Sequence, residues 1–142
     1  MSEAVPEETL LVWRSLLYVP ANNQRFIDKA HTRGADAIIL DLEDSVPAAE
    51  RDRARSMLAE SAAISSQAGS DVVVRINRPD AEVISDLDAT VIAGVDALML
   101  PKVDDAAHVQ AIADAVAGLE RGERPRHIFV RLPIEQLEQC LG

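Results

Sequence analysis

The stretch that decides the fold is GADAIILDLEDSVPAAERDRAR, residues 34–55. Its apolar run AIIL is followed at once by acidic residues and then by a longer segment with helical spacing of its apolar positions. A short, continuous apolar run is typical of a strand that helices cover in a parallel sheet. The stretch therefore predicts a strand over residues 37–40 that leads into a helix over residues 48–64.

The same alternation continues on both sides of this unit. We expect further strands over residues 15–19, 72–76, 97–100 and 127–134, and further helices over residues 24–33, 81–93 and 106–119. Strands that alternate with helical segments favour an α/β fold with a parallel sheet. Residues 1–12 carry Glu and Pro without a clear period and are expected to form a loose N-terminal arm, so the domain is assigned to residues 13–142.

Two α/β architectures fit this order of elements. The first is a TIM (β/α)8-type barrel, of which the chain supplies four β/α units and a fifth strand, a partial barrel compared with the usual length of about 250 residues. The second is an open five-stranded sheet of flavodoxin type, which needs no further residues. The motifs described below favour the barrel.

Composition excludes several classes of function. A content of 48% hydrophobic and 27% charged residues is typical of one globular domain. The net charge of -10 argues against a nucleic-acid partner, and apolar stretches of about five residues are far shorter than the roughly 20 of a membrane helix. A single cysteine and the lack of a leader-like N-terminus predict a cytoplasmic protein. The three histidines lack the spacing of a zinc site.

Polar and charged side chains gather where the predicted strands end. In a parallel sheet these ends share one rim, which is where barrel enzymes place their sites. For Asp44 and Ser45, which precede Pro47, helix capping is an equal alternative. For Lys102 the alternative is a solvated side chain or an ion pair. The strand-end residues are Asn22, Asn23, Asp41, Glu43, Asp44, Arg75, Asn77, Lys102 and Glu135.

Arg75 and Glu135 are the strongest candidates for chemistry. Arg75 ends the apolar run VVVR, so its guanidinium is expected to be desolvated and to bind an anion with two hydrogen bonds. That anion is either a structural Asp or Glu or a substrate carboxylate. Glu135 closes the fifth strand and is either a solvated terminus or an oxygen ligand for Mg²⁺.

Four stretches resemble the HpcH/HpaI aldolase and citrate lyase superfamily, and most closely its citrate lyase β-subunit-like CoA-ester lyases. They are RSLLYVPANNQRFIDKA, GADAIILDLEDSVPAAERDRAR, VVVRINRPD and VDALMLPKVDDAAHV, and they fall within residues 14–112. The resemblance implies a TIM barrel, a bound Mg²⁺ ion, and cleavage or formation of a carbon-carbon bond next to a CoA thioester.

The resemblance also implies roles for individual residues. Arg75 would bind the carboxylate or keto-acid end of the substrate, and Glu135 would bind both Mg²⁺ and substrate. Asn22 and Lys102 would contribute to substrate binding, while Glu43 and Asp44 would orient Lys102 or the metal's water ligands. The family's second metal ligand, a later Asp, has no counterpart before residue 142. Gln136 and Leu137 also depart from the usual small polar pair.

These observations predict a Mg-dependent carbon-carbon lyase that acts on a CoA ester of a hydroxy acid, of citryl-, malyl- or citramalyl-CoA type. We expect the chain to be a truncated form of an enzyme that is homo-oligomeric at full length. Two alternatives remain. One is an inactive fragment or pseudoenzyme that acts only by association, and the other is an acyl-CoA thioesterase on the same scaffold.

Overall fold

The computed structural model describes residues 12–78, 80–93, 95–120 and 127–130. The expected N-terminal arm therefore lies outside the described residues except for Val12, and Glu135 and Cys140 lie outside them as well. In the described part of the chain, no helix is both long enough and apolar enough to cross a bilayer.

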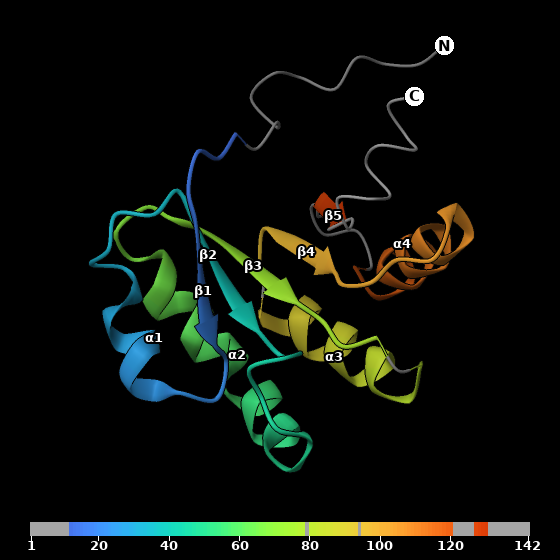
Figure 1. The fold of residues 1–142 in the computed structure, drawn as a ribbon, viewed down its shortest axis with the longest axis horizontal. Helices are drawn as coiled ribbons and strands as arrows, with labels where there is room; N and C mark the ends of the chain where they lie inside the picture. The colour runs from blue at the N-terminus through green and yellow to red at the C-terminus, as the bar shows by residue number, and fades with distance from the viewer. Residues whose placement is uncertain (1–11, 79, 94, 121–126, 131–142) are drawn as a thin grey trace.

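Strands and helices alternate along the whole described chain (Figure 1), as the apolar runs predict. In chain order they are β1 Leu16–Pro20, α1 Gln24–Ala30, β2 Ala37–Asp41, the short 3-10 helix η2 Ala48–Glu50, α2 Arg51–Ser66, β3 Asp71–Arg75, α3 Asp80–Ala93, β4 Ala97–Leu100, α4 Ala106–Glu120 and β5 His127–Val130.

Two helix predictions are wrong at their ends. The helix predicted over residues 24–33 begins as expected, because the Asn23 side chain accepts a hydrogen bond from the Phe26 backbone N–H at 3.2 Å and caps it. It ends at Ala30, three residues early, and Gly34 then turns the chain with a φ of 73° that favours glycine. The helix predicted from residue 48 starts as the 3-10 turn η2, and its α-helical part runs from Arg51 to Ser66.

The sheet is fully parallel and its strands follow one another in chain order, β1-β2-β3-β4-β5. A flavodoxin-type sheet would place β1 between β2 and β3, so the order excludes that alternative. Strands in sequential order with intervening helices are the arrangement of a TIM barrel. The prediction of a partial barrel of four β/α units and a fifth strand is confirmed.

The two faces of the sheet differ in how they are covered. Residues such as Ile38, Leu40 and Val74 face α1, α2 and α3 and belong to the main core, in which they are fully buried. The opposite face carries a smaller apolar cluster around Ile39 and Val73. On this second face Tyr18 of β1 stays 43% exposed, so the face that would line a barrel is open at its β1 edge.

Strand register brings the carboxyl ends together. Pro20 pairs with Asp41, Asp41 with Arg75, and Arg75 with Met99, so the four residues form one row across β1 to β4. Backbone bonds continue beyond the strands, from Leu42 N–H to the Arg75 carbonyl at 3.0 Å for example. This row forms the floor on which the candidate site is built.

Candidate functional site

A buried ion pair between Arg75 and Asp41 stands at the centre of the row. Arg75 Nε and Nη2 donate to the two Asp41 carboxylate oxygens at 2.8 and 2.7 Å. Asp41 also accepts from the Ser45 hydroxyl at 2.6 Å and from the Ser45 and Glu43 backbone N–H groups at 3.2 and 2.9 Å. Arg75 was expected to bind either a structural Asp or Glu or a substrate carboxylate with two hydrogen bonds. The structure shows the first alternative, with Asp41 as the partner.

These contacts fix the charge of both partners. Burial alone would raise the pKa of Asp41, but the hydrogen bonds from Arg75 and Ser45 outweigh it and lower the pKa below its usual value. The hydrogen bonds to Asp41 raise the pKa of Arg75 further above its already high value, against the effect of burial. Both groups are therefore charged at neutral pH.

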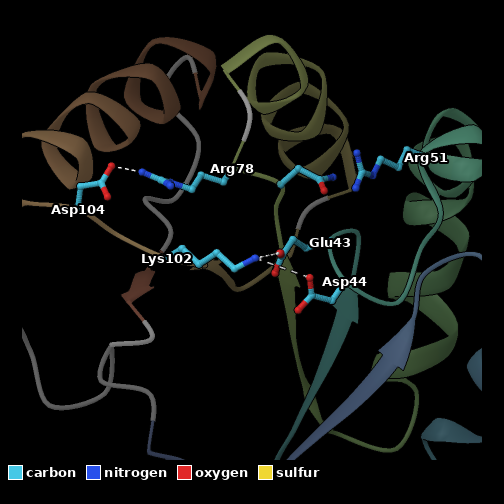
Figure 2. Close-up of a pocket in the computed structure, with 7 residues that line it drawn as sticks. Glu43, Asp44, Arg51, Arg78, Lys102 and Asp104 are labelled. Carbon is cyan, nitrogen blue, oxygen red and sulfur yellow. Dashed lines mark hydrogen bonds and ion pairs between the residues drawn. The ribbon is translucent and has the colours of Figure 1, made fainter. Parts of the chain in front are cut away.

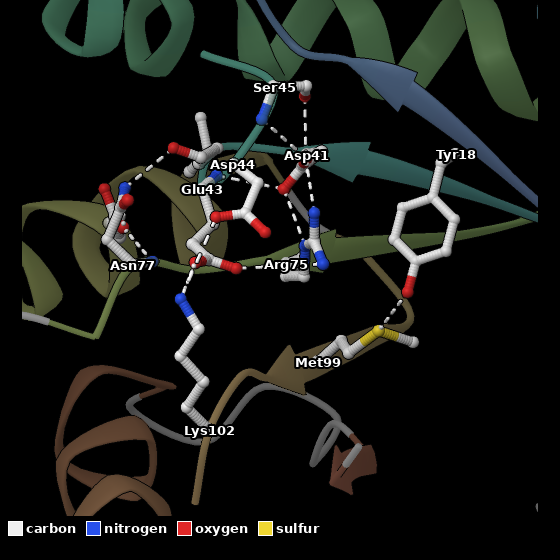
Figure 3. A network of polar contacts seen from close by, with 11 residues as sticks. Tyr18, Asp41, Glu43, Asp44, Ser45, Arg75, Asn77, Met99 and Lys102 are labelled. Atoms are coloured by element: carbon white, nitrogen blue, oxygen red, sulfur yellow. Dashed lines mark hydrogen bonds and ion pairs between the residues drawn. The ribbon is translucent and has the colours of Figure 1, made fainter. Parts of the chain in front are cut away.

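Glu43 lies between Arg75 and Lys102 (Figure 3). Its Oε1 is 3.7 Å from Arg75 Nη1, and its Oε2 accepts from Lys102 Nζ at 3.2 Å. Asp44 lies next to Glu43 at the same ammonium group, with 3.9 Å between Asp44 Oδ1 and Lys102 Nζ. Burial and the neighbouring Asp44 carboxyl raise the pKa of Glu43, while Lys102 and Arg75 partly offset that rise.

The backbone holds Lys102 in an unusual conformation. Lys102 is the one non-glycine residue with positive φ in the described chain, at 50°, which side chains with a Cβ rarely adopt. It follows the buried Pro101 directly after β4, and its side chain is 64% exposed. This turn brings the ammonium group of Lys102 back over the end of β2.

Tyr18 covers the face of the Arg75 guanidinium. The ring centroid is 4.8 Å from Arg75 Cζ, within the range of a cation-π contact. The Tyr18 hydroxyl donates to Met99 Sδ at 3.2 Å, so the ring reaches from β1 across to β4 beneath the row of strand ends. Tyr18 therefore fixes the plane of the guanidinium that Asp41 holds at its edge.

Asn77 joins the ends of β2 and β3 to α3. Its amide nitrogen donates to the Leu42 carbonyl at 2.8 Å and to Asp86 at 2.9 Å, and its backbone N–H donates to Asp86 at 2.7 Å. Asp86 is fully buried and also accepts from Arg55 of α2 at 2.8 Å. This network locks α2, α3 and the strand ends together.

A polar cavity of about 680 Å³ opens beside these residues (Figure 2). Arg51 at the start of α2 is bonded to Glu82 at 2.6 Å, and Arg78 after β3 is paired with Asp104. Three cationic and three anionic side chains line the cavity together with one amide, so it suits a polar ligand. Its lining residues are Glu43, Asp44, Arg51, Asn77, Arg78, Lys102 and Asp104.

The structure brings most of the predicted site residues together. Glu43, Asp44, Arg75 and Lys102 are linked by the contacts above. Asn22 also follows β1 at the same edge, but it donates to Glu50 Oε2 at 3.0 Å and does not line the cavity. Glu135 lies outside the described residues.

The capping alternative for Asp44 and Ser45 is wrong. No side chain caps η2 or α2, and the Ser45 hydroxyl bonds to Asp41 instead. Asp44 is drawn toward Lys102. Both residues therefore belong to the polar cluster around Arg75 rather than to the helix terminus.

The sequence did not single out Tyr18, Arg51 or Arg78. Tyr18 carries a usable signal, since alternation along β1 places it on the same sheet face as Asp41 and Arg75 once the register is known. In the sequence, Arg51 lies at the start of a predicted helix and Arg78 in a loop, and neither pattern indicates a site. Only the folded chain brings them to the cavity.

Within the described residues, no group of three Asp, Glu, His or Cys side chains is placed to hold a metal ion. Glu43 and Asp44 are adjacent carboxylates, but Lys102 already lies against both of them. The described residues therefore do not form a Mg²⁺ site by themselves.

Comparison with known proteins assigns the site to a family. The family model described as HpcH/HpaI aldolase/citrate lyase matches residues 14–139. The chain belongs to this family. The predicted resemblance to citrate lyase β-subunits is confirmed by relatives that carry that name, and the match covers β1 to β5 with all the strand-end residues described above.

Individual relatives agree with this assignment. The citrate lyase subunit beta of Leuconostoc mesenteroides subsp. cremoris is 35% identical over 130 residues, covering 91% of this chain and 43% of that protein. A (3S)-malyl-CoA thioesterase of Cereibacter sphaeroides is 39% identical over 105 residues, covering 73% and 37%. The chain thus spans about two fifths of the length of these curated relatives.

A solved structure supports the fold. RipC from Yersinia pestis aligns with a TM-score of 0.57 at 30% sequence identity, covering 83% of this chain and 45% of RipC.

Proposed function

We propose that this chain supplies the substrate-binding half of a Mg-dependent carbon-carbon lyase for a CoA ester of a hydroxy acid, of citryl-, malyl- or citramalyl-CoA type. The observation that carries the proposal is the Arg75 guanidinium, which Asp41 and Tyr18 hold at the strand ends next to Glu43, a residue that lines a polar cavity of about 680 Å³. Citrate lyase subunits and malyl-CoA thioesterases among its relatives support a CoA-ester substrate.

Arg75 would orient the reacting acid. Asp41 takes the Nε and one Nη2 proton, so the protons on Nη1 and the second proton on Nη2 are left to bind a carboxylate or keto-acid group. A guanidinium that is already fixed in position stabilises negative charge that develops on the substrate without a cost of reorganisation. Lys102, 64% exposed at the cavity, adds a second positive charge for the anionic substrate.

Mg²⁺ remains part of the proposal, with Glu135 as its ligand and with Glu43 and Asp44 as acceptors for its water molecules. When bound, the ion would polarise the oxygens of the reacting acid. The roles of Arg75, Asp41, Tyr18 and Lys102 do not depend on it, because their contacts are formed by this chain alone. We also propose that the complete enzyme is a homo-oligomer.

A thioesterase is the second candidate, and the 39% identity to malyl-CoA thioesterases favours it specifically. Both reactions need the acid and the thioester to be held in the same place. They differ in the bond that breaks. A non-catalytic chain that acts by association is the third reading, and it predicts no turnover of any CoA ester.

Product analysis separates the three. The chain would be completed with the C-terminal half of a citrate lyase β relative and given malyl-CoA in the presence of Mg²⁺. A lyase releases acetyl-CoA and glyoxylate, whereas a thioesterase releases free CoA thiol and malate. We expect the lyase products from the completed protein and none from an Arg75→Met version that assembles equally well. Free thiol alone would favour the thioesterase, and no product would overturn the enzyme proposal.

A further inference from the structure

The Arg75 guanidinium has one edge that is not hydrogen-bonded to Asp41. Asp41 occupies the Nε–Nη2 edge with bonds of 2.8 and 2.7 Å, and the Tyr18 ring covers one face at 4.8 Å. Each guanidinium has five N–H donors in a fixed fork, so the edge formed by Nη1 and Nη2 is the part that remains for another anion. Glu43 already lies there, with Oε1 3.7 Å from Nη1.

The Glu43 contact is loose compared with the Asp41 contact. At 3.7 Å the Glu43 carboxylate is beyond hydrogen-bond distance of Arg75, whereas its other oxygen makes a 3.2 Å bond to Lys102. Glu43 thus has a second cation to which it can turn. The Lys102 side chain is 64% exposed and free to follow it.

We propose that Glu43 occupies the place of the substrate carboxylate beside Arg75 when no ligand is bound. A ligand carboxylate displaces Glu43 from the open edge of Arg75 toward Lys102. This inference rests on the proposed function, since it concerns the same site, and it assigns Glu43 as the residue that limits anion affinity. The ligand class is a small carboxylate or keto acid that binds Arg75 end-on.

The charges around Arg75 also indicate that Glu43 opposes the binding of a carboxylate. Three carboxylates, Asp41, Glu43 and Asp44, face two cations, Arg75 and Lys102, so the immediate cluster carries one net negative charge. An incoming carboxylate is repelled until one of these charges is lost or moved. Two further ion pairs lie near this cluster, Arg51 with Glu82 and Arg78 with Asp104, and of these residues all but Glu82 line the cavity.

Protonation of Glu43 would also remove its negative charge from the open edge of Arg75. Burial and the neighbouring Asp44 carboxyl raise the pKa of Glu43, whereas the pKa of Asp41 is lowered, so Glu43 takes up a proton before Asp41 as pH falls. Asp41 stays charged because its pKa is lowered by Arg75 and Ser45. Ligand binding is therefore expected to strengthen with falling pH above the range in which Asp41 titrates.

The test compares Glu43→Gln with Asp44→Asn in the full chain. Both substitutions remove one negative charge next to Lys102, but only Glu43 lies against Arg75. Malate is the probe, and its affinity is read from the NMR signal of the Arg75 Nε–H group, which also reports whether the Asp41 bond persists. We expect Glu43→Gln to bind malate about tenfold more tightly than wild type and Asp44→Asn to gain less than about threefold.

Each outcome has a definite meaning. Equal gains in the two variants would overturn the inference, because a general charge effect would then suffice. Weaker binding in Glu43→Gln would overturn it as well, since Glu43 would then help to hold the ligand. In wild type, affinity should rise as pH is lowered from neutral to just above 4.5, the ordinary value that the pKa of Glu43 exceeds, and Glu43→Gln should lose that dependence. A wild type that binds equally at both pH values contradicts the displacement.

The inference and the proposed function fail differently. A tenfold gain in Glu43→Gln without turnover by the completed protein would refute the lyase and keep the displacement. Turnover that depends on Arg75, with malate affinity unchanged in Glu43→Gln, would keep the lyase and refute the displacement. No malate binding by wild type or by Glu43→Gln would refute both.

Discussion

Replacing Asp41 with Asn should leave the buried Arg75 guanidinium without its charged partner. Asp41 is 2% exposed and accepts five hydrogen bonds, two of them from Arg75. An Asn side chain has nearly the same shape, but it presents an NH2 group to donors that need an acceptor. Arg75 is then left with Glu43 at 3.7 Å and the face of Tyr18.

The size of the effect follows from the burial of both partners. Breaking a buried ion pair by removing one member costs about 3 to 5 kcal/mol. Glu43 and Tyr18 continue to compensate Arg75 in part, so we expect the lower end, about 3 kcal/mol in the free energy of unfolding. With a slope of about 1.5 kcal/mol per molar urea, the unfolding midpoint should fall by about 2 M.

Urea unfolding followed by circular dichroism measures this loss. Asp52→Asn is the matched control, because Asp52 also bonds an arginine, Arg55 at 2.5 Å, but its side chain is 95% exposed. We expect the control to cost less than about 0.5 kcal/mol. Adding Arg75→Met to Asp41→Asn removes the stranded charge and should recover about 1 to 2 kcal/mol. A cost for Asp41→Asn no larger than that of Asp52→Asn would refute the reasoning.

Three further outcomes are expected. Arg75→Lys keeps the charge but loses the fork, so kcat/KM of the completed enzyme should fall about ten- to a hundredfold, or about 1.5 to 3 kcal/mol, and unchanged kinetics would leave Arg75 a purely structural role. The lowered pKa of Asp41 means that its stabilising contribution is present above its ordinary value of 3.8 and is lost as pH falls through the lowered pKa. Wild type should therefore lose stability below about pH 4 more steeply than Asp41→Asn, and parallel curves would contradict this. Asp86→Asn should cost about 2 kcal/mol in urea unfolding because Asp86 is fully buried and bonded to Arg55, whereas the exposed Asp88→Asn should cost almost nothing.

Strand positions could be predicted because each buried strand is a continuous apolar run. The run AIIL becomes β2 with all its residues buried, and the polar residues after it mark where it ends. Helix ends were less predictable. The end of α1 depends on Gly34 and on the Thr32 hydroxyl, which donates to the Lys29 carbonyl at 2.6 Å, and neither contact is visible as periodicity.

The order of the strands could not be decided from local sequence. The same apolar runs fit a barrel and a flavodoxin-type sheet, because strand order depends on which helices pack side by side. The resemblance in the segments after β2, β3 and β4 favoured the barrel, and the observed order β1-β2-β3-β4-β5 agrees with it.

The strand-end rule gathered Glu43, Asp44, Arg75 and Lys102 correctly into one cluster, since all parallel strands end at the same edge. The rule did not predict which hydrogen-bond or ion-pair partner each side chain has. Whether Arg75 meets Asp41 or a ligand depends on register, which places Asp41 directly beside it. The stacking of Tyr18 spans three strands and depends on the shape of the whole sheet.

The most direct test is an activity assay of this chain with and without the rest of the barrel. From the open face around Tyr18, and because the described residues contain no group of three metal-binding side chains, we expect the 142-residue chain alone to bind Mg²⁺ weakly and not to cleave malyl-CoA or citramalyl-CoA. Adding the C-terminal half of a citrate lyase β relative as a separate chain should restore stability and turnover together, and Arg75→Met should abolish the turnover while the two halves still associate. Robust turnover by the unaided monomer, or full activity of the Arg75→Met assembly, would contradict the account.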